Sequence, residues 1–111
     1  MEEAADYSAS EEKVISPQIY LMGAKLPFGV TMGDVEKALA SVKGDLEELF
    51  QKWGLTKMVV LLKVDQGKVK GIQAKIYQGK GYKKEVLEKV FQRITFTSSV
   101  TGTLELELLY M

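Results

Sequence analysis

The segment from Thr56 to Gln78 constrains the fold of this chain more than any other. Its first half alternates apolar side chains on one face, and Val59 and Leu61 are apolar on the other face as well. A short polar turn follows, in which Gly67 can take a positive φ. The pattern predicts a β-hairpin whose first strand, residues 57–64, lies inside its sheet, because a strand that is apolar on both faces is covered on both.

The return strand of this hairpin, near residues 68–77, is basic where the first strand is apolar. Its apolar positions change parity between Val69 and Ile72, so a single regular alternation does not fit it. One extra residue in a strand has this effect, and a glycine often marks the place. We therefore expect a β-bulge near Gly71.

Two helices are predicted from apolar residues spaced by three and four positions. The first covers residues 32–53, begins at Thr31 with Asp34 three residues later, and stops at Gly54. Gly44 lies inside it, where a kink or close packing would account for a glycine. The second helix is expected near residues 83–93.

A last strand, near residues 102–110, is predicted from alternating leucines and polar residues. The fold class is therefore α+β, with two helices packed on one face of a three-stranded antiparallel sheet in the order (β)-α-β-β-α-β. The bracketed element is the apolar run from Gln18 to Ala24, which is either an N-terminal strand or an apolar strap. The sheet is antiparallel throughout only if the last strand pairs with residues 57–64, which makes residues 68–77 and 102–110 the outer strands.

Length and composition predict a single domain preceded by a tail. A chain of 111 residues with 46% apolar residues can build one core. Residues 1–16 are acidic and lack periodicity, which indicates a disordered tail or linker, and residues 17–111 form the expected domain. No apolar run reaches the roughly 18 residues that a membrane helix needs, so we expect any membrane attachment to come from a missing N-terminal anchor.

The residue types restrict the chemistry that the chain can perform. It contains no cysteine and no histidine, which removes the thiolate ligand and nucleophile and the commonest general base. No metal site and no cofactor are predicted. Glutamate, aspartate, lysine, tyrosine and serine remain, but no motif arranges them, so an enzyme is the least favoured of three function classes.

A basic surface supplies the second function class. Six lysines and no acid occur in the return strand and the loop after it, accompanied by Tyr77 and Tyr82: Lys68, Lys70, Lys75, Lys80, Lys83 and Lys84. This composition fits a small nucleic-acid-binding or anion-binding domain. The run contains no arginine, and "GKGYKK" lacks the spacing of a phosphate-binding P-loop. A solvated sheet edge therefore remains the more favoured interpretation, and nucleic acid is not the expected partner.

The favoured class is a protein-interaction module that uses the last strand as an open sheet edge. An edge strand presents unpaired N–H and C=O groups to which a partner strand can bind. The predicted contact residues are Thr103, Leu104, Glu105, Leu106, Glu107 and Leu108. The two carboxylates would select a partner that alternates basic and apolar residues, either an extended peptide or a second copy of the domain.

The order and spacing of three segments resemble TonB C-terminal-like domains. The first is "GLTKMVVLLKVDQGKVKGIQ", in which Gly54 and Leu55 precede the apolar strand and Gly67, Lys68 and Val69 form the turn. The second is the helix end "VFQRITF", and the third is the closing strand "TGTLELELLY". The AgmX/PglI C-terminal branch, found in gliding-motility and envelope proteins, is the most similar, although the cysteines of some members have no counterpart here.

The resemblance implies a periplasmic module of an anchored cell-envelope protein. Domains of this kind bind partners and do not catalyse reactions. TonB itself couples the energy of the inner membrane to outer-membrane receptors by adding a receptor strand to its sheet. An envelope protein or peptide segment is therefore the implied partner, and residues 1–16 would end a linker that spans the periplasm.

Overall fold

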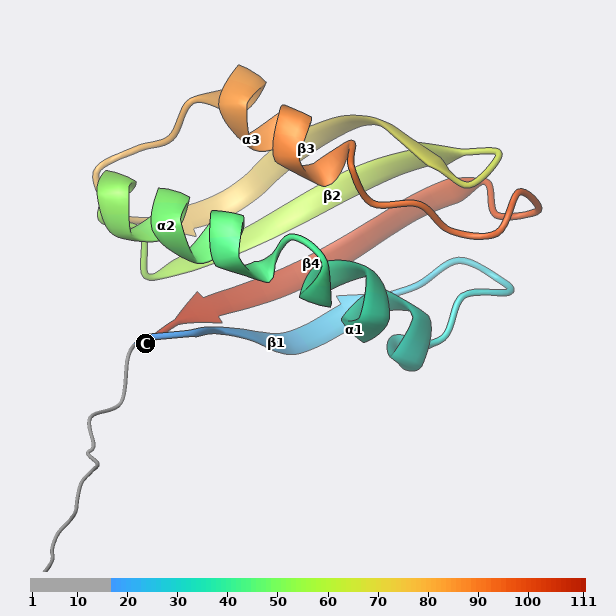
Figure 1. Cartoon of the computed structure of the whole chain (residues 1–111), viewed down its shortest axis with the longest axis horizontal. Helices are drawn as coiled ribbons and strands as arrows, with labels where there is room; N and C mark the ends of the chain where they lie inside the picture. Colours follow the sequence, from blue (N-terminus) through green and yellow to red (C-terminus); the bar gives the residue numbers. More distant parts are fainter. Residues whose placement is uncertain (1–16) are drawn as a thin grey trace, which may run out of the picture.

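The computed structural model describes residues 17–111 as one α+β unit with a four-stranded antiparallel sheet. The elements are β1 Ile19–Lys25, α1 Met32–Ala40, α2 Lys43–Trp53, β2 Lys57–Asp65, β3 Lys68–Gln78, α3 Lys84–Phe91 and β4 Gly102–Tyr110. The strand order is β1-β4-β2-β3, as Figure 1 shows. The predicted α+β class, the interior position of β2 and its pairing with the last strand are thereby confirmed. The predicted tail, residues 1–16, lies outside the described residues.

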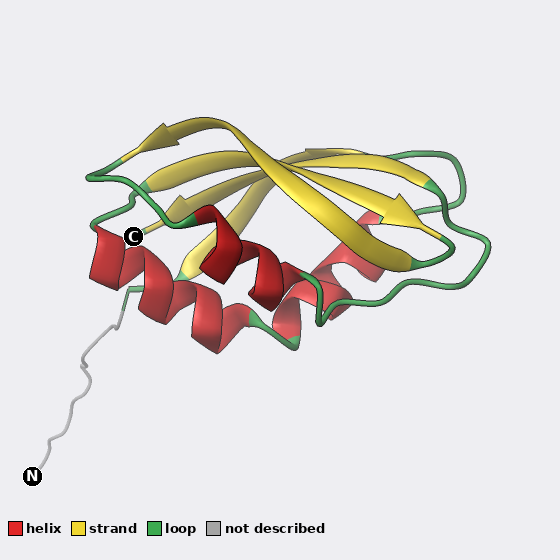
Figure 2. Cartoon of the chain, turned by 90° about the horizontal axis from the view of Figure 1, so that it is seen from above, coloured by secondary structure: helices red, strands yellow, loops and turns green. Residues whose placement is uncertain are grey.

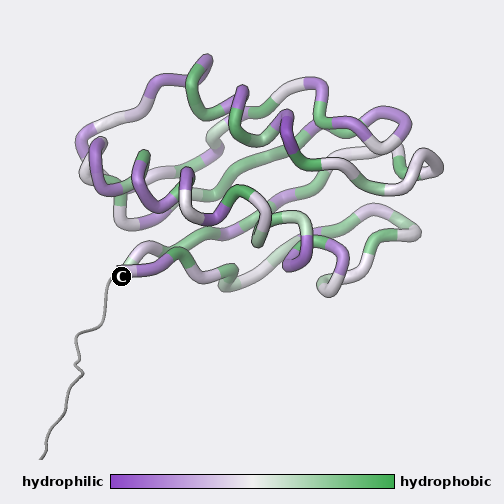
Figure 3. Tube along the Cα trace, viewed as in Figure 1, coloured by the Kyte–Doolittle hydropathy of each residue, from purple (hydrophilic) through white to green (hydrophobic). Residues whose placement is uncertain are grey.

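All three helices cover the same face of the sheet (Figure 2). Alternate residues of β2 and β4 point into the core between these two layers because successive side chains of a strand point to opposite faces. Hydrophobic and hydrophilic residues accordingly alternate along the helices and strands of the trace in Figure 3. The largest fully buried side chains include Phe50, Leu62, Phe91, Leu104, Leu106 and Leu108.

The single helix predicted over residues 32–53 is in fact two helices. The backbone leaves the α-helix at Ser41, whose hydroxyl group donates to the carbonyl of Ala38 at 2.6 Å. The Val42 N–H bonds to the carbonyl of Leu39, a tighter turn than the α-helix makes. Val42 has φ −121° and is 1% exposed. The apolar spacing thus continues across the break and gave no sign of it, and the kink considered at Gly44 lies instead at Ser41 and Val42.

The apolar run at the N-terminal end is a strand, and its position corrects the predicted sheet edge. β1 pairs antiparallel with β4, with Ile19 opposite Tyr110 and Lys25 opposite Glu105. β4 also pairs along its other side with β2. The sheet therefore has four strands where three were predicted, and β4 is an interior strand. The edges of the sheet are β1 and β3.

The β3 edge is irregular and partly covered. Its register against β2 shifts twice. At these shifts Lys70 and Lys75 have no residue opposite them in β2. The first shift adjoins Gly71 and confirms the predicted bulge. Helix α3 lies along this edge (Figure 1), and the Glu88 carboxylate accepts a hydrogen bond from the Ile72 N–H at 3.2 Å. Bulges, lysines and covering side chains are the usual means by which proteins prevent a further strand from adding to an edge.

Candidate functional site

The predicted binding strand, β4, does not provide an open edge. Its backbone is paired with β1 on one side and β2 on the other. Leu104, Leu106 and Leu108 are buried beneath the helices. The carboxylates of Glu105 and Glu107 lie on the uncovered face, where both are already paired with lysines.

These ion pairs connect β4 to three other strands. Glu105 contacts Lys75 at 3.2 Å and Lys25 at 3.8 Å, and Glu107 contacts Lys57 at 3.3 Å. Exposed pairs of this kind contribute about 0–1 kcal/mol each. Their role here is cross-strand pairing within the sheet, so the partner selectivity predicted for the two carboxylates loses its basis.

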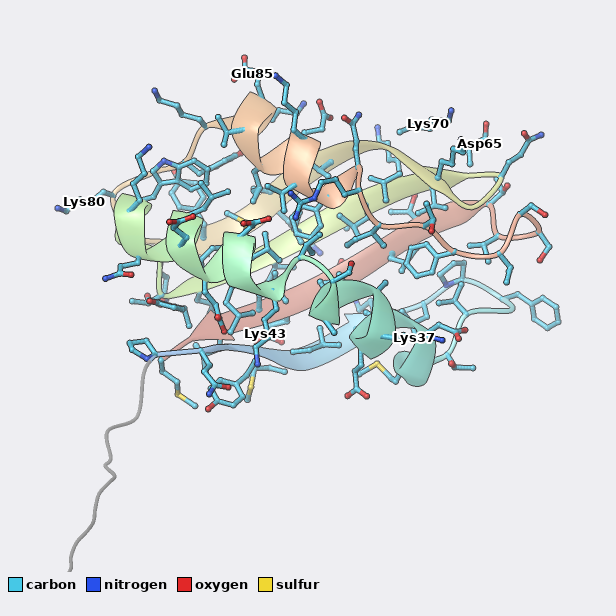
Figure 4. The ribbon with its side chains drawn as sticks, in the orientation of Figure 1. Lys37, Lys43, Asp65, Lys70, Lys80 and Glu85 are labelled. Atoms are coloured by element: carbon cyan, nitrogen blue, oxygen red, sulfur yellow. The ribbon has the colours of Figure 1, made fainter. Side chains whose placement is uncertain are left out.

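The six lysines of the alternative basic surface do not form one patch. Lys68 and Lys70 lie beside the hairpin turn, whereas Lys80 lies beyond the opposite end of β3, a strand of 11 residues. Figure 4 shows Lys70 and Lys80 at opposite ends of the molecule. Lys75 is engaged with Glu105. The continuous run in the sequence is thus divided in space by the length of the strand.

Two of these lysines contribute to a cleft that the sequence did not reveal. Lys80 and Lys83 line a space of about 310 Å³ together with Trp53, Tyr82 and, from α2, Lys52. The basic run in the sequence does not include Lys52, which is distant from it along the chain. The turn at Gly54 brings the end of α2 next to the loop that follows β3.

The outer edge of β1 carries main-chain groups without a partner strand among residues 17–111. Gln18 and Met111 exchange two backbone hydrogen bonds, of 2.8 and 3.0 Å. Hydrogen bonding alternates along an antiparallel pair, so the N–H and C=O groups of Ile19 and Leu21 point away from β4. The Ile19 N–H donates a hydrogen bond to the Glu47 carboxylate at 2.9 Å. Leu21 therefore presents both of its groups outward.

An apolar groove runs beside this edge, between β1 and the first two helices. Its volume is about 410 Å³. Leu39 and Ala40 of α1 and Leu46 of α2 line it, together with residues 19–22 of β1. Lys43 lies at its margin, where its ammonium group bonds to the Gln18 side chain at 3.1 Å. The edge and the groove together form the β1 site, which consists of residues 19–25, Leu39, Ala40 and Leu46.

A third cavity, of about 540 Å³, separates α1 from residues 93–100. Its lining mixes polar and apolar residues, and two of its three charged side chains are engaged. Arg93 pairs with Asp45, and Asp34 exchanges hydrogen bonds with Thr31 in the capping box that the sequence predicted. The cavity therefore offers fewer free groups than the β1 site.

Within residues 17–111, no three acidic side chains gather where they could hold a metal ion. None of the helices in that same range is long and apolar enough to cross a membrane. Comparison of the chain with protein-family models, curated proteins and solved structures finds no match.

Proposed function

We propose that the protein is a non-catalytic interaction module that binds an extended segment of a partner protein along β1. The observation that carries the proposal is the combination of an outward-facing main-chain edge and an apolar groove beside it. Strand addition uses both: main-chain hydrogen bonds give affinity, and pockets for alternate side chains give selectivity.

The geometry of β1 defines what such a partner would contribute. A strand laid against β1 meets the N–H and C=O groups of Leu21 and the C=O group of Ile19. Every second side chain of the partner then points to the helix side of the sheet, into the groove over Leu39 and Leu46. The intervening side chains lie on the uncovered face near Tyr20, which is 40% exposed, and Met22, which is 56% exposed. The fitting partner is a segment with aliphatic residues at alternate positions.

The placement of the module in a cell-envelope protein is part of the same proposal. It is supported by the resemblance of residues 31–110 to TonB C-terminal-like domains, in which strand addition is the mode of binding. The order of elements from α1 to β4 is compatible with that resemblance. The binding mode does not depend on it, because the open edge is a property of β1 itself.

The test uses proline, which removes an N–H group from one chosen position. The Leu21 N–H faces outward, so Leu21→Pro should leave the sheet intact, as prolines at strand edges do. Heptapeptides displayed at random are selected on the wild-type protein and counter-selected on this variant. We expect the surviving sequences to alternate apolar residues, and we expect their synthetic versions to shift the backbone amide resonances of residues 19–25.

The matched control is Tyr20→Pro. Tyr20 faces Leu109 in the position where the N–H bonds to β4, so this variant should lose a hydrogen bond of the sheet. Leu21→Pro should keep the sheet hydrogen bonds and lose peptide binding, with a loss of stability limited to the packing of the Leu21 side chain against the core. The proposal fails if no sequence survives the counter-selection. It also fails if the amide shifts fall on the loop around Lys80 and leave β1 unchanged.

A further inference from the structure

The cleft at the end of α2 combines positive charge with aromatic surface. Lys52, Lys80 and Lys83 supply three ammonium groups, and Trp53 and Tyr82 supply two aromatic rings. We propose that this cleft binds one nucleotide unit, in which a phosphate lies next to an aromatic base. The unit can come from single-stranded nucleic acid or from a free mononucleotide, and binding here is independent of the β1 site.

The loop that carries the cleft is held firmly against α2. The Lys80 N–H donates to the Trp53 carbonyl at 3.3 Å. The aliphatic stem of Lys80 passes over Gly54, where its Cγ atom lies 3.4 Å from the position of an added Cβ. Gly79 is packed so closely that a Cβ there would lie 2.5 Å from the Gly54 carbonyl oxygen. The loop backbone and the base of the Lys80 side chain are thus fixed before any ligand arrives.

The aromatic side chains are also positioned by their neighbours. Tyr77 at the end of β3 packs edge-to-face on Tyr82, with ring centroids 5.1 Å apart and an interplanar angle of 78°. Trp53 is half-buried in the last turn of α2. Proteins that bind single strands combine basic grooves with aromatic rings on which bases stack, and this cleft has both components.

The three lysines form no ion pair within the described part of the chain. Five ion pairs occur among residues 17–111, and none involves Lys52, Lys80 or Lys83. Glu85, in the first turn of α3, projects from a different side of the molecule than Lys80 (Figure 4). A phosphate group would supply the missing negative charge.

The size of the cleft decides how much of a ligand it can hold. About 310 Å³ is at the lower end of the range for ligand pockets. This space matches the size of a single nucleotide unit. The cleft is broadly open to solvent, so neighbouring units of a strand can leave it on either side.

Trp53 is the only tryptophan in the chain, so its fluorescence reports binding directly. The wild-type protein is titrated with decathymidylate at 50 and 200 mM salt. Each phosphate contact on a single strand contributes about −0.7 to the slope of log K against log salt, so three contacts predict a slope of about −2 and an affinity loss of about 20-fold between the two salt concentrations.

Two double variants of equal charge distinguish the cleft from general attraction. Lys80→Gln with Lys83→Gln should leave one phosphate contact, so the affinity should fall only about threefold between 50 and 200 mM salt. At 50 mM salt this variant should bind more weakly than the wild type. Lys68→Gln with Lys70→Gln should behave as the wild type, because these lysines lie at the other end of β3. The proposal is wrong if the two double variants change the affinity for decathymidylate equally. It is also wrong if decathymidylate leaves the fluorescence of Trp53 unchanged.

Two further probes identify the source of the nucleotide and the need for its base. If thymidine monophosphate binds as tightly as the decamer, the natural ligand of the cleft is a free nucleotide. If thymidine monophosphate binds much more weakly than the decamer, the ligand is a single strand. An abasic decamer should bind less tightly than decathymidylate and should not quench Trp53. Equal affinity of the abasic decamer would refute the stacking that the proposal requires.

Discussion

Replacing Gly67 by alanine tests how the hairpin turn is attached to the rest of the domain. Gly67 has φ +81°, and a Cβ atom there would lie 2.5 Å from the Phe96 carbonyl oxygen and 2.7 Å from that of Thr97. The left-handed conformation costs an alanine about 1–2 kcal/mol, and forcing a methyl group into a filled space costs about 1–3 kcal/mol. The free energy of unfolding should therefore fall by about 2–5 kcal/mol.

Gly29 provides the matched control, because its φ is +89° and no atom lies within 4 Å of an added Cβ. Gly29→Ala should cost only the conformational term of about 1–2 kcal/mol. Urea unfolding followed by Trp53 fluorescence measures both variants, and an unchanged m-value allows the midpoints to be compared. Equal losses would show that residues 96–97 give way freely, and the reasoning from the contact distances would be wrong.

Two other predictions concern the core and the break between the first two helices. Phe50→Ala and Leu62→Ala should each cost about 2–5 kcal/mol as buried large-to-small changes, whereas Lys70→Ala and Glu105→Ala should stay within about 0.5 kcal/mol; similar losses from both sets in denaturant melts would contradict the assignment of sheet faces. Gly44→Ala should raise stability by about 0.5–1 kcal/mol, because no atom lies within 4 Å of an added Cβ; a lower melting midpoint would indicate that the bend at Val42 needs the glycine.

The sequence predicted those elements whose side chains alternate or recur with a regular period. The interior position of β2 followed from its two apolar faces, and the pairing of β2 with β4 followed from the requirement that the sheet be antiparallel. The bulge beside Gly71 followed from a change of parity. Each of these inferences uses only the side-chain direction, which the periods of 2 and 3.6 determine.

The features that the sequence did not predict depend on the backbone or on distant contacts. The break at Ser41 separates α1 from α2 but keeps the spacing of apolar residues, so the pattern of apolar residues does not reveal it. The pairing of β1 with β4 could not be predicted from the apolar run of residues 18–24, because such a run fits a strand or an apolar strap equally well. Lys52 joined the cleft only through the turn at Gly54, which brings two separate segments of the chain together.

The two edges of the sheet differ in a way that bears on function. β3 carries Lys68, Lys70 and Lys75, has two bulges and lies under α3, so it has several of the features that prevent strand addition. β1 has one bulge, between Leu21 and Gly23, and no charged side chain from Ile19 to Ala24. An apolar edge without charges is costly to leave open, because it invites pairing with other chains. The chain protects one edge and leaves the other suited to a strand, and this asymmetry is the reason to seek the partner at β1.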